Sequence, residues 1–225
     1  MKNIKINKEQ LEKIKKEVND IFVMVLDTET IGLTNRIIYN IGYKIFNLNT
    51  CEVVVKNDFI VQQFYDNKPL MMTAYYKDKR PLYTSLMKGK KARKEKWGNI
   101  MKIMCQDIKK YQINNCYAYN SSFDIKSIET TMELFPKNKN NILNYVTIKD
   151  IMKYINPIVE SEDFEKFAID NGNVSDITGK PSKSAQSLYR YITNDPNFIE
   201  SHTALADCDI ELDILLTALA FADKL

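Results

Sequence analysis

The sequence predicts one α/β domain built on a mixed five-stranded sheet, with three antiparallel strands followed by two parallel strands and helices flanking them. Strand-like apolar runs fill the first 60 residues, and short strands alternate with amphipathic helices after residue 97. This order is typical of a mixed sheet covered by helices. The 225 residues suit one ordinary domain with extensions, and 44% hydrophobic with 27% charged residues exclude a wholly disordered chain.

The first part of the chain predicts a helix and three strands. Leu11, Ile14 and Val18 are spaced for a narrow apolar helical stripe, so we expect residues 1–20 to form an appendage on a main domain of residues 21–225. Runs rich in β-branched residues that are too short for a buried helix predict strands. The expected helix covers 8–20, and the expected strands cover 21–28, 36–46 and 51–60.

The second part of the chain predicts alternating helices and strands. Apolar residues at helical spacing alternate with short apolar runs, and Pro136 marks the end of one helix. The expected helices cover 97–112, 122–135, 149–155, 184–193 and 204–223, with strands at 115–120 and 143–148. Residues 160–183 are polar and predict a loop.

The positive charge is concentrated in one segment. The chain has a net charge of +3. The segment from Lys77 to Lys96 contains nine Lys and Arg residues but only two acidic residues, Asp78 and Glu95, so its own net charge is +7. It lies within residues 61–97, an insertion that is long for a simple connection. Two interpretations stay open: the insertion contacts single-stranded nucleic acid through interleaved aromatic and cationic residues, or it is a packed flap whose lysines are solvated.

No segment suggests a membrane or secreted protein. The apolar runs are far shorter than the roughly 18–20 residues of a membrane span, and the N-terminus lacks the pattern of a signal peptide. Four cysteines without paired spacing indicate reduced thiols. We therefore expect a cytoplasmic protein, and the richness in Lys, Asn and Ile suggests a bacterial cell or a phage-infected host.

Two acidic residues mark the end of the first strand. Asp27 and Glu29 are two positions apart, so strand geometry directs both side chains to the same face. Neighbouring carboxylates repel each other and need a cation, for which a hard divalent metal is the simplest candidate. Because a strand that ends in solvent has the same pattern, other residues must support this interpretation.

Three motifs supply that support. The stretch DTETIGL (27–33) resembles the first signature of the DEDD superfamily of 3′–5′ exonucleases, and NSSFD (120–124) resembles the second. The only histidine, His202, precedes Asp207 by five residues at a predicted helix start, as in the third signature of the histidine branch. Five helical positions turn by about 140°, so we expect His202 on the preceding loop. The resemblance spans about residues 21–223 and is greatest to proofreading subunits of bacterial polymerases and phage-type relatives.

The resemblance implies a ribonuclease H-like fold and two-metal hydrolysis with Mg²⁺ or Mn²⁺. It implies release of 5′-mononucleotides from 3′ ends of single-stranded DNA, with nucleic acid as partner and a polymerase or replication protein as a further partner. The implied ligands of the metal that binds the nucleophilic water are Asp27, Glu29 and Asp207. Asp27 and Asp124 are the implied ligands of the second metal. His202 is the implied general base. The implied substrate contacts are Thr30, Gly32, Leu33, Asn120 and Phe123.

Alternatives to this interpretation concern both function and motif. An exoribonuclease that trims RNA 3′ ends would use the same metal site, because the sequence does not locate a group that recognises the 2′-OH. A catalytically silent binding module is disfavoured, since all five active-site side chains are present. Tyr191 and Asp195 have the spacing of the third signature of the tyrosine branch, but Pro196 disfavours a helical conformation at Asp195.

The sequence also departs from the family pattern. Ile31 replaces the usual second threonine of the first signature, and Tyr119 stands where many members have histidine. Neither residue is an implied metal ligand. Glu211 lies one helical turn beyond Asp207, and we expect it to face solvent or a lysine rather than a metal.

Overall fold

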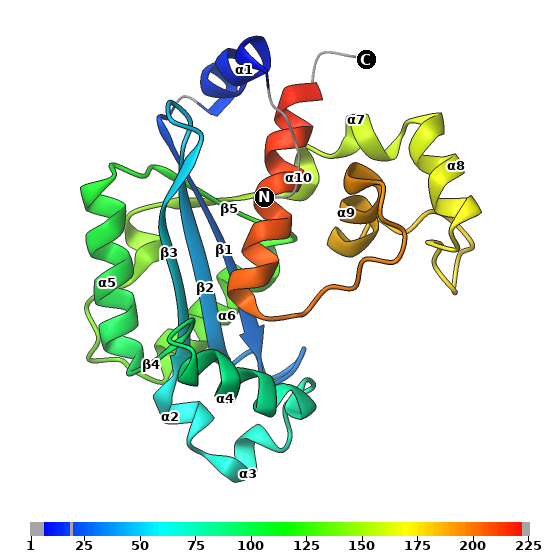
Figure 1. The fold of residues 1–225 in the computed structure, drawn as a ribbon. Coiled ribbons are helices and arrows are strands. Elements are labelled where there is room, and N and C mark those ends of the chain that lie inside the picture. The colour runs from blue at the N-terminus through cyan, green and yellow to red at the C-terminus, as the bar shows by residue number, and fades with distance from the viewer. Residues whose placement is uncertain (1–6, 19, 222–225) are drawn as a thin grey trace.

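A computed structural model describes residues 7–18 and 20–221 and contains a six-stranded mixed sheet of order β4-β3-β2-β1-β5-β6 (Figure 1). The strands are β1 (Phe22–Thr30), β2 (Ile38–Asn47), β3 (Glu52–Val61), β4 (Arg93–Glu95), β5 (Asn115–Ala118) and β6 (Thr147–Asp150). The first three pair antiparallel, whereas β5 and β6 run parallel to β1. The predicted class is confirmed, and the arrangement is compatible with a ribonuclease H-like fold.

The prediction of five strands was one strand short. The additional strand, β4, lies inside the basic insertion and pairs parallel with β3 at the sheet edge. Its sequence, Arg-Lys-Glu, has no apolar alternation, because an edge strand of three residues is held by its backbone pairing rather than by a buried face. Periodicity therefore could not reveal it.

Both faces of the sheet are covered by helices, and β1 contributes alternate residues to each face. Met24 and Leu26 pack in one hydrophobic cluster with α5 (Trp97–Lys110) and α6 (Ser121–Glu133). Val23 and Val25 pack in the other cluster with α10 (Ala204–Phe221). Because side chains alternate along a strand, the later odd-numbered residues of β1 also face α10.

The start of α10 rests directly on β2. A Cβ atom added at Gly42 would lie 2.6 Å from the carbonyl carbon of Ala204 and 2.7 Å from Leu205 Cα, so only glycine permits this approach. Beside it, Asn40 Oδ1 accepts a hydrogen bond of 2.9 Å from the Ala204 N–H group. This bond satisfies one of the backbone donors that a helix start leaves free. Gly42 and Asn40 therefore fix where α10 begins.

The N-terminal helix and the C-terminal half of the chain cover the α10 face of the sheet. In α1 (Lys8–Val18), Ile14 and Val18 are fully buried in the same cluster as α10. The other helices near α10 are α7 (Asn156–Val159) and α9 (Ala185–Thr193). Of the predicted terminal helices, residue 19 and residues 222–223 lie outside the described residues.

Three predictions in residues 140–183 were wrong wholly or in part. The predicted loop contains α8 (Glu162–Asp170), which begins where Ser161 Oγ accepts a 3.2 Å hydrogen bond from Phe164 N–H and which buries Phe164 and Ala168. The helix predicted at 149–155 is the end of β6 followed by a single 3-10 turn, η3 (Ile151–Lys153). A 3-10 turn, η2 (Ile142–Asn144), also replaces the start of the predicted strand.

The basic insertion is folded onto the end of the sheet. It forms α2 (Gln62–Tyr65), α3 (Lys68–Met71), the 3-10 turn η1 (Lys77–Lys79), α4 (Arg80–Lys88) and β4. Tyr83 of α4 is fully buried, and its hydroxyl donates a 3.1 Å hydrogen bond to Asn40 Oδ1. Most of its lysines are exposed, which agrees with both interpretations of the insertion.

Among the described helices, none is both long and apolar enough to cross a membrane. The four cysteines are free thiols: Cys51 is exposed, and Cys105, Cys116 and Cys208 are buried.

Candidate active site

A pocket of about 470 Å³ opens where β1 and β5 end, beside the start of α10. It is lined by all ten residues that the sequence predicted for catalysis, metal binding or substrate contact. These are Asp27, Glu29, Thr30, Gly32, Leu33, Asn120, Phe123, Asp124, His202 and Asp207. The pocket therefore brings together three stretches of chain that are far apart in the sequence.

β1 directs its residues to two sides of the pocket. Asp27 and Glu29 continue the alternating series of β1 residues that face α10. Thr28 lies on the opposite face of the strand, towards α6. The Thr28 hydroxyl donates a 2.7 Å hydrogen bond to Asp124 Oδ1, so β1 also orients a carboxylate that comes from another element. Asp124 lies in the first turn of α6.

The start of α6 depends on Asn120. This residue adopts φ 58° and ψ 52°, a left-handed conformation that asparagine tolerates better than most residues. Its N–H group donates a 3.0 Å hydrogen bond to Asp150 Oδ1, which ties the turn to the end of β6. The turn leads the chain from β5 into α6 at the angle that brings Asp124 into the pocket.

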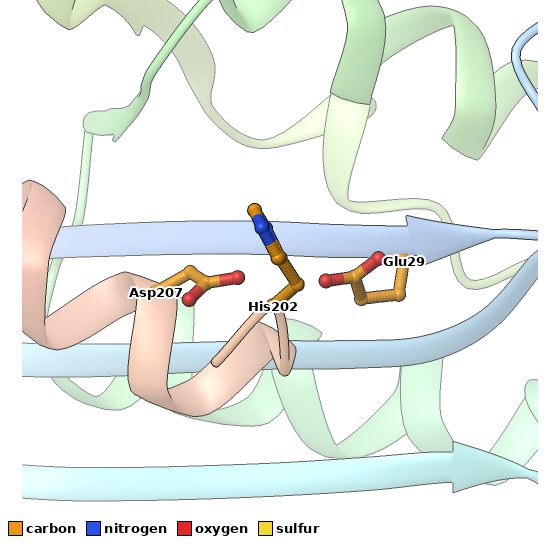
Figure 2. A group of neighbouring side chains, drawn as sticks. All are labelled: Glu29, His202 and Asp207. Carbon is orange, nitrogen blue, oxygen red and sulfur yellow. The ribbon is translucent and has the colours of Figure 1, made fainter. Parts of the chain in front are cut away.

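Figure 2 shows the carboxylates of Glu29 and Asp207 facing each other, with His202 between them. One potential ligand atom from each of these three residues lies within 4.8 Å of the other two, a spacing that could hold a metal ion. His202 is on the loop before α10, and Asp207 is in the first turn of that helix, as the sequence predicted.

Burial raises the pKa values of the acidic residues. Desolvation raises the pKa of Asp124 to about 7, and desolvation followed by repulsion from Glu200 raises that of Asp207 to about 8. Desolvation also raises the pKa values of Asp27 and Glu29 well above the ordinary range, with neighbouring carboxylates adding to the effect. Burial without a cation therefore favours the protonated forms of these acids.

Three buried carboxylate oxygen atoms have no hydrogen-bond partner among the described residues. They are Asp27 Oδ2, Asp207 Oδ1 and Glu211 Oε2. Buried polar atoms in folded proteins are nearly always paired, so these unpaired carboxylate oxygens are atoms that could bind a cation. Oxygen ligands of this kind suit Mg²⁺ or Mn²⁺.

The prediction for Glu211 was wrong. Its side chain is buried and lines the pocket instead of facing solvent. Desolvation, then repulsion from Asp124, raises its pKa well above the ordinary range. The sequence did contain a signal for this position. Residues four apart share one face of a helix, and Asp207 was already predicted to face the site.

Other pocket residues had no signal in the motifs. Glu200 is largely buried, with its Oε2 3.8 Å from His202 Nδ1. Tyr75 and Tyr76 reach the pocket from the insertion, and Tyr119 lines it after β5. These residues could not be predicted from the motifs, because the packing of the insertion and of the loop before α10 brings them to the pocket.

The rival tyrosine signature is not part of this pocket. Tyr191 packs edge-to-face against Phe164 and near Phe167, and neither Tyr191 nor Asp195 lines the pocket.

No family model matches the chain, and no curated protein matches its sequence. Any proposal of function therefore depends on the residues of the pocket.

Proposed function

We propose that the protein is a metal-dependent 3′–5′ exonuclease that releases 5′-mononucleotides from the 3′ ends of single-stranded DNA. The observation that carries the proposal is the convergence of Asp27, Glu29, Asp124, Asp207 and His202 on one pocket, with buried carboxylate oxygens left unpaired. Few reactions other than phosphodiester hydrolysis require this combination of acids around one imidazole.

Under this proposal, the acidic residues would hold two divalent cations. Asp27, Glu29 and Asp207 would hold one ion, and Asp27 and Asp124 the second. When bound, the ions supply Lewis-acid stabilisation of the negative charge on the reacting phosphodiester oxygens. The unpaired oxygen atoms of Asp27 and Asp207 favour this role, because cation binding would remove the cost of burying them.

His202 suits the role of general base. Burial, and then the nearby Lys79 ammonium group, lower the pKa of His202 below its ordinary value. The imidazole is therefore neutral at pH 7 and has a nitrogen atom free to accept the proton of the attacking water. Its side chain is 38% exposed, so water reaches it from the pocket.

Apolar side chains at the edge of the pocket suit a nucleobase. Leu33 is 75% exposed and Tyr75 is 74% exposed, although both are large apolar or aromatic residues. Phe123 lines the same pocket, with the Arg36 guanidinium group 5.1 Å from its ring centroid. Exposed aromatic surfaces next to cations are typical of single-strand binding, where bases stack on rings. The terminal nucleotide would therefore contact Leu33 and Phe123.

Labelled single-stranded DNA and RNA of one sequence, incubated with Mg²⁺ or with EDTA, test the proposal. Wild-type protein should shorten the DNA from its 3′ end with Mg²⁺ and not with EDTA. Asp124→Asn keeps an oxygen for the Thr28 hydroxyl but loses the charge, and it should reduce the rate at least about 100-fold. Glu129→Gln, at an exposed acid of the same helix, is the matched control and should keep the wild-type rate.

Each other outcome has a defined meaning. Shortening of RNA alone would replace the proposal with exoribonuclease activity. Binding of either polymer without cleavage by folded protein would indicate a silent binding module. Full activity of Asp124→Asn, or activity in EDTA, would contradict the proposed use of these residues.

A further inference from the structure

We infer that Tyr76 and Lys79 of the insertion are positioning residues that hold His202 in its place in the pocket. The kinetic part of this inference rests on the proposed function, whereas the contacts can be tested without it. The insertion would then be part of the active site and not only a surface for substrate.

His202 needs such support because of its backbone conformation. It has φ 50°, which lies in the left-handed region that is uncommon for residues other than glycine, although histidine adopts it more often than most. A residue in this region stays there only when its surroundings hold it. Glu200 does not hold the imidazole, since its Oε2 is 3.8 Å from Nδ1, too far for a hydrogen bond.

Lys79 supplies the contact to the backbone. Its Nζ donates hydrogen bonds to the carbonyl oxygen of Ser201 and, at 3.5 Å, to that of His202. These two carbonyl groups stand on either side of the His202 Cα atom, so one ammonium group restrains both peptide planes. An ammonium group has three donors, and this geometry uses two of them on the loop rather than leaving them for a substrate phosphate.

Tyr76 supplies the contact to the side chain. Its ring stacks on the imidazole with centroids 4.8 Å apart and planes 15° from parallel. Lys79 Nζ lies 4.1 Å from the centroid of the same Tyr76 ring, so the two positioning residues also hold each other. The segment is anchored to the loop after β1, where the Tyr75 N–H group donates a 3.0 Å hydrogen bond to the Ile31 carbonyl.

The single histidine makes the contact directly measurable by NMR, because the imidazole protons of His202 give the only histidine signals. In metal-free protein without substrate, Tyr76→Leu should move these signals downfield by removing the ring current, and Tyr76→Phe should leave them in place. Lys79→Met should broaden or split the signals, because the loop loses its restraint, and Lys79→Arg should restore one set.

Kinetics with Mn²⁺ and single-stranded DNA test the consequence. A base displaced by about 1 Å can cost on the order of 100-fold in rate, so Lys79→Met and Tyr76→Leu should reduce kcat by about 10–100-fold. KM should stay unchanged, and Tyr76→Leu should keep wild-type Mn²⁺ affinity because it removes neither an acidic residue nor a charge. For Lys79 this comparison uses Lys79→Arg, which keeps the cation that lowers the pKa values of Glu29 and Asp207. Lys68→Met, at an exposed lysine of the same insertion, is the matched control and should match wild type in every measurement.

The outcomes separate this inference from the proposed function. Unchanged NMR signals in both Tyr76→Leu and Lys79→Met would overturn it, as would changed signals with an unchanged kcat. A loss of Mn²⁺ affinity in Tyr76→Leu would also overturn it, because Tyr76 would then support the whole pocket. If the wild type shows the expected signals and no nuclease activity, the proposed function fails while the contacts stand.

Discussion

At the scale of single residues, the pocket is defined by acids that have been buried at an energetic cost. Asp27, Asp207 and Glu211 each keep an oxygen atom without a partner among the described residues. A protein of marginal stability retains such groups where binding a ligand repays the cost. This feature distinguishes the pocket from the exposed carboxylate pairs that occur on many protein surfaces.

Glu211→Gln tests whether this residue belongs to the acidic cluster. In EDTA the variant should melt at a higher temperature than wild type, because it removes one buried acid from among others, and its amide can donate to a neighbouring carboxylate. The stabilisation gained on adding Mn²⁺ should be smaller than for wild type, because one carboxylate is missing. Differential scanning calorimetry measures both effects.

Glu165→Gln, at an exposed acid of α8, is the control for that measurement and should melt like the wild type under both conditions. A lower melting temperature of Glu211→Gln in EDTA would contradict the view that Glu211 is repelled by its neighbours.

At the scale of elements, the contact between α10 and β2 sets the geometry of the site. Asp27 is paired directly across from Gly42, so the start of α10 passes over the strand beside the first carboxylate. His202 and Asp207 flank this start. A shift of α10 would therefore move His202, the proposed base, and Asp207 relative to β1.

Gly42→Ala should displace α10 from the sheet. The added methyl group meets backbone atoms of Ala204 and Leu205, which cannot rotate away, and overpacking of this kind costs about 1–3 kcal/mol. We expect a lower free energy of unfolding, measured by urea denaturation, and a lower exonuclease rate. Gly98→Ala is the control, since its Cβ would lie 4.0 Å from the Asn138 side chain on a regular helix and should not lower stability.

The exposed lysines of the insertion can be tested without disturbing its fold. Deleting the segment would remove the buried Tyr83, whereas Lys88, Lys90 and Lys91 are exposed near the end of α4. Changing these three lysines to Gln should weaken binding of single-stranded DNA. The slope of log K against log salt concentration should fall by up to about 2, since each phosphate contact contributes about 0.7.

Fluorescence anisotropy at several salt concentrations measures this slope. Changing the exposed Lys153, Lys166 and Lys180 to Gln removes the same charge elsewhere on the chain and is the control. Equal loss of affinity in both triple variants would indicate a general effect of net charge, and an unchanged slope in the first would favour the packed flap alone.

At the scale of the whole molecule, the buried acids link stability to pH and to metal. Asp124 and Asp207, with pKa values raised to about 7 and about 8, are protonated in the folded state at pH values where the unfolded chain has released those protons. The metal-free folded state therefore binds more protons, and its stability falls as pH rises through these values. The lowered pKa of His202 acts in the opposite direction, but only at lower pH.

In EDTA, we therefore expect a lower melting temperature at pH 8.5 than at pH 6.5, with about 2–4 °C lost for each kcal/mol of stability. Mg²⁺ should raise the melting temperature more at pH 8.5 than at pH 6.5, because the cations need ionised carboxylates. In EDTA, the melting temperature of Asp124→Asn should fall less between pH 6.5 and pH 8.5 than that of the wild type. A melting temperature that rises with pH in EDTA would show that the acids are ionised without a cation.

The elements closest to the site were the most predictable. The β-branched run of β1 and the spacing of Asp27 and Glu29 fix both the strand and the face that its acids share, because side chains alternate along any strand. The position of His202 before the last helix followed in the same way from the turn per residue of a helix. The edge strand β4 and the short helix α8 were missed because so few of their residues are buried.

The sequence by itself determined the strand and helix starts that carry Asp27, Glu29, Asp124, His202 and Asp207, since each depends on periodicity within about ten residues. Only the tertiary structure decided that Glu211 is buried and that Lys79 reaches the carbonyl groups beside His202. These outcomes depend on which distant segments pack together. Local periodicity defines the face that an element buries, whereas the neighbour against which it is buried is set by the packing of the whole chain.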